Sequence, residues 1–430
     1  MQEGWKIYKL GELMTLITDY HANGAYKKLK ANVTLKDTKD YAAMIRSTNF
    51  EKNDFNDLKY IDEHAFHFLA KSKVNTGDVL MNKIANPGTV YFMPEMGIPI
   101  SLGMNLFLLR FEETRVKPYY LYKYLKANQS YVKSFSGGSV TRTITKDAVK
   151  NLEIKLPSLK EQNAIASILS ALDHKIELNK QMNKTLEEMA LALYKHWFVD
   201  FGPFKSSLEG GTGDDDCELV DSVWGQLPKG WEVKTLDNWI DLNPRLSLPK
   251  GSLSTFVEMK ALPVQAMSVS AIAKKEFKGG TKFQNGDTLF ARITPCLENG
   301  KTAFVDFLEE KEIAFGSTEY LVMRAKKNVS KYWTYCIARD HNFRKFSRST
   351  MVGTSGRQRV QKDPLLSYEL AQPNATIFKD FTEKVEPWFH QIRMNTIETQ
   401  TLTKLGDTLL PQLISGTISV KEALKQVHQV

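Results

Sequence analysis

The amino-acid sequence predicts an α+β protein in which two pseudo-symmetric globular domains are separated by two long antiparallel coiled-coil helices. Three observations support this prediction: a helical stretch longer than a globular domain is wide, a set of motifs that occurs twice in the same order, and short apolar runs that alternate with turn residues. The long stretch predicts the helices, the repetition predicts the pseudo-symmetry, and the short runs predict β-rich domains.

The first long helix is expected over residues 156–200. After Pro157 the chain has neither proline nor glycine for about forty residues. At ~1.5 Å per residue, such a helix reaches about 60 Å. Apolar residues recur in the spacing of a coiled-coil seam, with the polar Asn179 and Asn183 in its middle. The apolar seam positions are Ile165, Leu169, Leu172, Ile176, Leu186, Ala190, Leu193 and Trp197.

The sequence around this helix repeats itself. The lysines of the repeated motifs ITKD and VQKD, Lys146 and Lys362, are 216 residues apart (362 − 146). The same offset moves Pro157 onto Pro373 and therefore predicts a second long helix. The other repeated stretches are GWKIYKLGELMTL (4–16) with GWEVKTLDNWIDL (230–242), GDVLMNKI (77–84) with GDTLFARI (286–293), and LGMNLFLLR (102–110) with FGSTEYLVM (315–323).

The second helix carries a matching seam, and Asn395 falls on the copy of Asn179. We therefore expect the two helices to pack against each other, with the buried amides fixing the register at some cost in stability. Pro387 and Pro411 have no counterpart in the first helix and should kink the second helix or limit its regular part. The apolar seam positions are Phe381, Val385, Trp388, Ile392, Leu402, Leu409 and Leu413.

The expected order of the chain is domain, helix, linker, domain, helix and tail. Within each domain, β-rich runs such as NLFLLRF and EYLVMRA alternate with turns and with helical runs such as KPYYLYKYLKAN and SKYWTYCIARD. The linker mixes glycine and serine with three aspartates, which are better explained as solvated charges than as a metal site. The expected boundaries are 1–155, 156–200, 201–229, 230–372, 373–416 and 417–430.

Composition and motifs argue against an enzyme. The 58 basic and 49 acidic residues give a net charge of +9, which favours a polyanionic partner. Three scattered cysteines fit a reducing cytoplasm, and no apolar run is long enough to predict contact with a membrane. The Gly-Lys pair at residues 300–301 has Pro295 where a phosphate-binding loop needs glycine, and Asp241, Glu258 and Lys260 match a nuclease pattern only loosely. We interpret the chain as non-catalytic, without a metal site or a bound cofactor.

Two glycine-containing loops, at residues 134–147 and 351–363, are the best candidates for contacts with DNA bases. Arginine can bind both acceptors of guanine, and glutamine can pair with adenine in the same two-point manner. Either loop alone is better explained as an ordinary hairpin, but their recurrence at equivalent positions favours binding. The candidates are Ser139, Thr141 and Arg142 in the first loop and Thr354, Ser355, Arg357, Gln358 and Arg359 in the second.

Further candidates lie in two other pairs of corresponding loops. Basic residues near the start of each domain are suited to clamping phosphates, although a solvated loop explains them nearly as well. Because the two domains share motifs but differ in these loops, we expect a bipartite and asymmetric site on double-stranded DNA. The candidates are Lys27, Lys28, Arg245 and Lys250 near the domain starts, and Lys83, Asn86, Arg292, Asn299 and Lys301 after the Gly-Asp motifs.

Together, these stretches resemble the DNA specificity subunit of type I restriction-modification enzymes. The resemblance covers nearly the whole chain and is sharpest at residues 156–169, 230–236, 283–301 and 316–320. It implies that each domain is a target recognition domain and that the long helices are conserved spacer helices. Two methyltransferase subunits would dock and modify an adenine in each half-site, and a motor-nuclease restriction subunit would join for cleavage. S-adenosylmethionine, ATP and Mg²⁺ would then belong to these partner subunits.

Two other functions stay open at this stage: a stand-alone bivalent DNA-binding regulator, and a scaffold that binds proteins and never touches DNA. Apolar residues away from the seams favour protein partners in either case. They are Ile168, Met182, Met189 and Tyr194 on the first helix and Phe389, Met394, Ile397 and Leu405 on the second.

Overall fold

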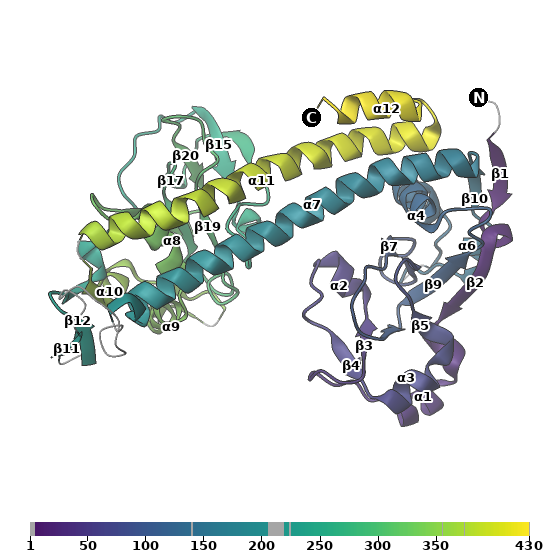
Figure 1. The fold of residues 1–430 in the computed structure, drawn as a ribbon, viewed down its shortest axis with the longest axis horizontal. Helices are drawn as coiled ribbons and strands as arrows, with labels where there is room; N and C mark the ends of the chain where they lie inside the picture. The colour runs from purple at the N-terminus through teal and green to yellow at the C-terminus, as the bar shows by residue number, and fades with distance from the viewer. Residues whose placement is uncertain are drawn as a thin grey trace. The chain divides into compact units, whose positions relative to one another are not determined.

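A computed structural model describes residues 5–138, 141–204, 219–222, 225–354, 356–373 and 375–429 (Figure 1). The chain forms two compact units, one made of residues 1–175 and 401–430 and the other of residues 176–400. Each unit contains a β-rich domain and part of both long helices, α7 (Leu159–Tyr194) and α11 (Ala375–Ser415). The predicted α+β fold with two long paired helices is confirmed.

The two long helices run antiparallel where they meet. In the second unit, Asn179 donates to the Glu398 carboxylate at 2.8 Å, and Asn183 accepts from Asn395 at 2.9 Å. A higher residue number on α7 therefore meets a lower residue number on α11, as antiparallel helices require. Asn179 is fully buried and Asn395 is 4% exposed. The polar layer predicted at the middle of the seam therefore lies between the helices, where its hydrogen bonds favour one register.

The prolines of α11 do not limit the helix, so that part of the prediction was wrong. The helix runs from Ala375 to Ser415 through both Pro387 and Pro411. A proline removes one helical N–H, and the loss is tolerated when neighbouring turns are anchored by packing. Phe381 and Val385 are fully buried just before Pro387.

The first unit contains two four-stranded sheets, with strand orders β2-β9-β6-β7 and β4-β3-β8-β5. The first sheet is antiparallel, whereas β3 and β8 of the second are parallel. The strands are β2 (Met14–Asp19), β3 (Ala42–Ile45), β4 (Lys59–Ile61), β5 (Lys73–Val74), β6 (Val79–Asn82), β7 (Val90–Phe92), β8 (Ile100–Leu102) and β9 (Leu106–Phe111). The helices are α1 (Tyr26–Asn32), α2 (Ser47–Glu51), α3 (Glu63–Phe68), α4 (Pro118–Ala127), α5 (Gln129–Ser134) and α6 (Lys146–Lys150), with α12 (Val420–Val427) after α11.

The second unit repeats this arrangement, with strand orders β14-β21-β18-β19 and β16-β15-β20-β17 and with β15 and β20 parallel. The sequence repeat is therefore a repeat of the fold. The strands are β14 (Ile240–Leu242), β15 (Leu253–Val257), β16 (Ala273–Glu276), β17 (Thr281–Phe283), β18 (Thr288–Ala291), β19 (Thr302–Phe304), β20 (Ala314–Gly316) and β21 (Tyr320–Ala325). The helices are α8 (Lys331–Arg339), α9 (His341–Ser349) and α10 (Lys362–Leu366).

In each domain the first strand and the last strand pair with each other, antiparallel. In the first unit β1 (Lys6–Lys9) pairs with β10 (Glu153–Leu156), and in the second β13 (Glu232–Thr235) pairs with β24 (Glu369–Gln372). Part of the segment expected to be a flexible linker also pairs, as β11 (Leu219–Ser222) with β12 (Gly225–Pro228), where Val220 faces Leu227. The three linker aspartates lie outside the described residues.

The repeated Gly-Asp motif has a structural explanation. Asp78 binds Arg110 through two hydrogen bonds of 2.8 Å, and Asp287 binds Arg324 through two of 2.7 Å. Each aspartate also accepts from the backbone N–H three residues before it. Both motifs therefore tie a turn to the strand that lies beside it in the sheet.

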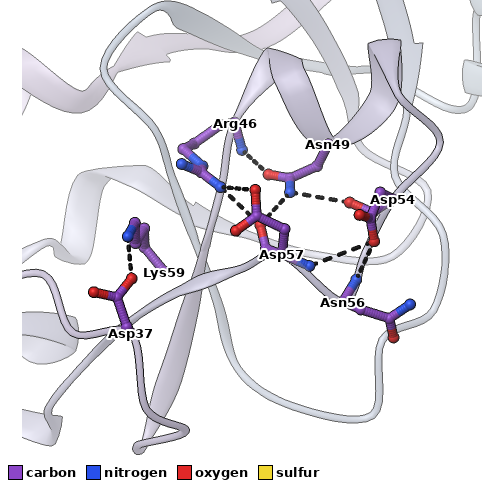
Figure 2. Close-up of polar contacts among 7 residues, drawn as sticks. All are labelled: Asp37, Arg46, Asn49, Asp54, Asn56, Asp57 and Lys59. Atoms are coloured by element: carbon purple, nitrogen blue, oxygen red, sulfur yellow. Dashed lines mark hydrogen bonds and ion pairs between the residues drawn. The ribbon is translucent and has the colours of Figure 1, made fainter. Parts of the chain in front are cut away.

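The connection from β3 to β4 is held by a network that belongs to the first domain (Figure 2). The buried Asn49 side chain accepts from the Arg46 backbone N–H and donates to the carbonyls of Asp54 and Asp57. The Arg46 guanidinium donates to the same Asp57 carbonyl at 2.7 Å, and Lys59 pairs with Asp37 at the start of β4. This loop is therefore fixed by side-chain bonds to its own backbone.

The core of the second domain includes side chains of both long helices. Ala190 and Tyr194 of α7 and Phe381 and Phe389 of α11 are buried in one cluster with residues of the domain. Tyr194 and Phe389, together with Ile168 in the first unit, were expected to face protein partners, and that expectation was wrong because all three are less than 8% exposed. A coiled-coil pattern identifies the seam between two helices but not a third element packed beside it.

Replacing Asn395 with alanine should lower the free energy of unfolding by about 1–3 kcal/mol, because the amides of Asn183 and Gln391 would each lose a buried partner. Replacing Asn183 and Asn395 together with leucine should instead raise Tm, since apolar pairs stabilise a seam better than polar ones. Denaturation followed by circular dichroism measures both effects, with Asn56→Ala as the exposed control. A lower Tm for the double variant would contradict this account.

Candidate nucleic-acid interface

The two loops singled out in the sequence are held in the same way in both domains. In the first domain Gly137 and Thr143 exchange backbone hydrogen bonds of 2.9 and 2.8 Å, and the Ile144 N–H donates to the Lys83 carbonyl at 3.0 Å. In the second domain β22 (Met351–Val352) pairs with β23 (Arg359–Val360), and the Val360 N–H donates to the Arg292 carbonyl at 2.9 Å. Both loops are therefore hairpins anchored on the strand extension after the Gly-Asp motif.

The first hairpin presents Thr141 and Arg142 to solvent, whereas Ser139 lies outside the described residues. Gly138 is required at its turn: its φ is +111°, and an added Cβ would lie 2.4 Å from the Thr141 carbonyl oxygen. The exposed Asn86 lies two residues after Ile84, whose backbone pairs with Thr143 of this hairpin. These side chains are free to reach a ligand without rearrangement of the domain.

Lys83 has a different position from the one expected of a DNA contact. Its ammonium is buried and lies 2.9 Å from Asp19 Oδ2, while Lys146 lies 3.4 Å from Oδ1 of the same carboxylate. Burial alone would raise the pKa of Asp19, but its bonds with Lys83 and its attraction to both lysines hold that pKa below the usual value. Lys83 therefore joins the hairpin anchor to β2 inside the domain.

The second hairpin presents Thr354 and Arg357 to solvent, with Gln358 partly buried and Ser355 outside the described residues. Arg359 is held by Glu319: its Nε and Nη2 both lie within 2.9 Å of a carboxylate oxygen. The Arg359 side chain is still 44% exposed, but its hydrogen bonds brace the base of the hairpin.

The remaining candidates also divide into residues that are bonded within their own domain and residues that are exposed to solvent. Arg292 donates to the Val360 carbonyl at 3.0 Å, and Lys301 donates to the Met259 carbonyl at 2.8 Å, so both stabilise their own domain. Lys28 lies over the Phe68 ring at 5.7 Å while remaining exposed. The other candidates, Lys27, Arg245, Lys250 and Asn299, are exposed.

The sequence interpretation missed the carboxylates that hold Lys83 and Arg359. Asp19 ends β2, and Glu319 lies in the GSTEY motif, far in sequence from Lys83 and Arg359 respectively. An acidic residue inside a repeated motif near basic loops was the available signal for Glu319.

Among the described residues there is no cluster of histidine, cysteine and acidic side chains suited to a metal ion. None of the described helices combines the length and the apolar character that a membrane span needs.

Comparison with known proteins gives consistent matches over the chain. The family profile described as "Type I restriction modification DNA specificity domain" matches residues 2–188. The MjaIX specificity subunit of Methanocaldococcus jannaschii is 30% identical over 71% of this chain and 69% of its own length. The HindI specificity subunit of Haemophilus influenzae is 24% identical over 96% of this chain and 99% of its own length. Both relatives are named as subunits of type I restriction enzymes.

The fold has a counterpart among solved structures. The crystal structure of the type I restriction-modification S subunit from M. genitalium aligns with a TM-score of 0.58 at 13% identity. The alignment covers 96% of each chain. At this identity the match supports the fold, including both domains and both long helices.

Replacing Asp19 with asparagine should lower the free energy of unfolding at pH 7 by about 3 kcal/mol, because it leaves the buried Lys83 without a counter-charge. Since the folded pKa of Asp19 lies below its ordinary 3.8, the contribution is present above that pH and is lost as the pH falls through the folded value. Urea denaturation at pH 7 and pH 3 measures the difference. Asp37→Asn, at a carboxylate that is 85% exposed, is the control.

A destabilisation that is equal at both pH values would contradict the ion pair as its cause. So would an equal effect of Asp37→Asn at pH 7.

Proposed function

The chain belongs to the DNA specificity subunits of type I restriction-modification systems, and on this premise we propose that its two β-rich domains each read one half of a split site on double-stranded DNA. The long helices set the separation of the two readers. The family is non-catalytic, so the activities of the complete enzyme lie in partner subunits.

The observation that carries this proposal is the equivalence of the two hairpins. In each hairpin, a backbone N–H of the second strand donates to a backbone carbonyl outside the hairpin. The donor is Ile144 and the acceptor Lys83 in the first domain, and the donor is Val360 and the acceptor Arg292 in the second. The placement of their side chains nevertheless differs: Thr141 and Arg142 are adjacent in the first hairpin, whereas Thr354 and Arg357 are three residues apart in the second and are followed by Gln358. Two hairpins with the same backbone anchoring and differently placed side chains suit two domains that read different sequences, so the target is bipartite and asymmetric.

We assign base contacts to residues of the two hairpins and phosphate contacts to the exposed loops. Arg142 and Arg357 are suited to two-point recognition of guanine, and Gln358 to recognition of adenine. The hydroxyls of Ser139, Thr141, Thr354 and Ser355 complete the hairpin set. The phosphate contacts are Lys27, Lys28, Asn86, Arg245, Lys250 and Asn299. The anchored Lys83, Arg292, Lys301 and Arg359 keep the loops in place, and the net charge of +9 favours the approach to DNA.

The partner subunits dock on the long helices. Met182, Met189, Met394 and Ile397 are 38–47% exposed and lie away from the seam, so they offer apolar contacts along both helices. We propose that two methyltransferase subunits bind there and modify an adenine in each half-site, and that a restriction subunit joins for cleavage. S-adenosylmethionine, ATP and Mg²⁺ are bound by these partners, and the assembly works in the cytoplasm.

Replacing Arg142 with alanine should relax recognition in one half of the methylated motif, at about 1–3 kcal/mol for the base pair concerned. Replacing Arg357 should relax the other half alone. Methylome sequencing of cells that carry each variant measures both. Lys250→Ala is the control, expected to weaken methylation without changing the motif, and a uniform loss for Arg142→Ala would reassign that residue to the phosphates.

The purified chain should not transfer methyl groups or cleave DNA when it is supplied with S-adenosylmethionine, ATP and Mg²⁺. Adding the cognate methyltransferase subunit should restore methylation of a split motif. Incorporation of labelled methyl groups into plasmid DNA measures this. Turnover by the chain alone, or tight sequence-specific binding that needs no partner, would instead favour an enzyme or a stand-alone regulator.

A further inference from the structure

Each domain is attached to a long helix by a tyrosine that donates to a carboxylate. In the first unit the Tyr119 hydroxyl of α4 lies 2.8 Å from Asp173 Oδ2 of α7. In the second unit the Tyr332 hydroxyl of α8 lies 2.8 Å from Glu386 Oε1 of α11. The two tyrosines are 213 residues apart (332 − 119) and are each the second residue of an equivalent helix. The long helices repeat at 216 residues, so the copy of Asp173 is Phe389 (173 + 216), and Glu386 lies three residues before it. The tyrosines are therefore equivalent, and each binds a carboxylate at a different position of its long helix.

The surroundings of this bond are not the same in the two units. Beside Tyr119, the buried Lys123 also reaches Asp173 at 2.6 Å. Beside Tyr332, the ring of Phe389 lies with its centroid 4.5 Å away. The position equivalent to Lys123 is the apolar, buried Cys336 (123 + 213). The hydroxyl–carboxylate bond is therefore common to both attachments, whereas a neighbouring ion pair in one is replaced by apolar packing in the other.

The attached helix leads directly to the hairpin that reads DNA. In the first domain α4 is followed by α5 (Gln129–Ser134) and then by the hairpin, and in the second domain α8 is followed by α9 (His341–Ser349) and then by β22. Arg344 of α9 donates to the Ala338 carbonyl of α8 at 3.1 Å and is 9% exposed, so the α8–α9 corner is stiff. Movement of α8 would therefore carry the hairpin with it.

We propose that Tyr119 with Asp173 and Tyr332 with Glu386 are positioning pairs that set the number of base pairs accepted between the two half-sites. The inference rests on the proposed function and deepens it. A hydrogen bond to a carboxylate is directional and strong, whereas apolar packing alone permits sliding. Because successive base pairs are ~3.4 Å apart, a small shift of the hairpin is enough to change the spacing that fits.

Tyrosine-to-phenylalanine variants test the pairs most cleanly. Replacing Asp173 would also leave the buried Lys123 unpaired, whereas Tyr119→Phe and Tyr332→Phe remove one oxygen and keep the ring. The matched control is Tyr124→Phe: Tyr124 also lies on α4, but its hydroxyl accepts from the Lys155 N–H within the domain. All variants are assembled with the methyltransferase subunit and assayed on DNA in which both half-sites are fixed and the spacer varies in single base-pair steps.

The preference for the native spacer over one longer or shorter by one base pair should fall by about tenfold in Tyr119→Phe and in Tyr332→Phe. The loss should be larger in the double variant. Discrimination between correct and mutated half-sites should stay within about twofold, because the hairpin side chains are untouched. Tyr124→Phe should keep the native spacer preference even if its Tm falls as much as that of Tyr119→Phe.

An unchanged spacer preference in the active double variant would overturn the proposal and leave the proposed function intact. A loss of half-site discrimination instead of spacer discrimination would also overturn it. If the wild-type complex methylates no split site at all, the proposed function fails, and this inference fails with it.

Discussion

The pairing of α7 with α11 is the contact on which the rest of the structure depends, because both β-rich domains use these helices to complete themselves. In the second unit, side chains of both helices lie inside the domain core. In the first, the Gln162 amide of α7 accepts from the Lys117 N–H and donates to the carbonyls of Arg115 and Pro157. A shift in the register of the pair would therefore misplace the acids and the core residues that the domains need.

The architecture could be predicted from the sequence because it rests on periodic and repeated features. The seam spacing indicated both helices, and the copy of Asn179 at Asn395 indicated that they meet. The prolines of α11 were misjudged because tertiary packing outweighs the local preference against proline within a helix. Tyr194 and Phe389 were misjudged because a one-dimensional pattern separates seam from non-seam positions and cannot tell a domain core from an open surface.

The candidate site was predictable only at the level of loops. The two hairpins were identified because they recur, and the structure gives them equivalent anchors. Which of their side chains face solvent depends on partners that are distant in sequence: Asp19 pairs with Lys83 across 64 residues, and Glu319 with Arg359 across 40. No spacing rule links such residues, so anchored and exposed cations looked alike. The assignment of individual residues to bases or phosphates stays a prediction.

The strand pairs β1–β10 and β13–β24 bring the first and last residues of each domain side by side. Everything between them is one closed insertion, joined to the remaining chain at a single place. Genetic exchange of the DNA between the codons of these strands would therefore replace a whole β-rich domain and leave the helix pair in frame. If each domain reads one half-site, as we propose, such an exchange would replace the specificity for that half-site in a single step.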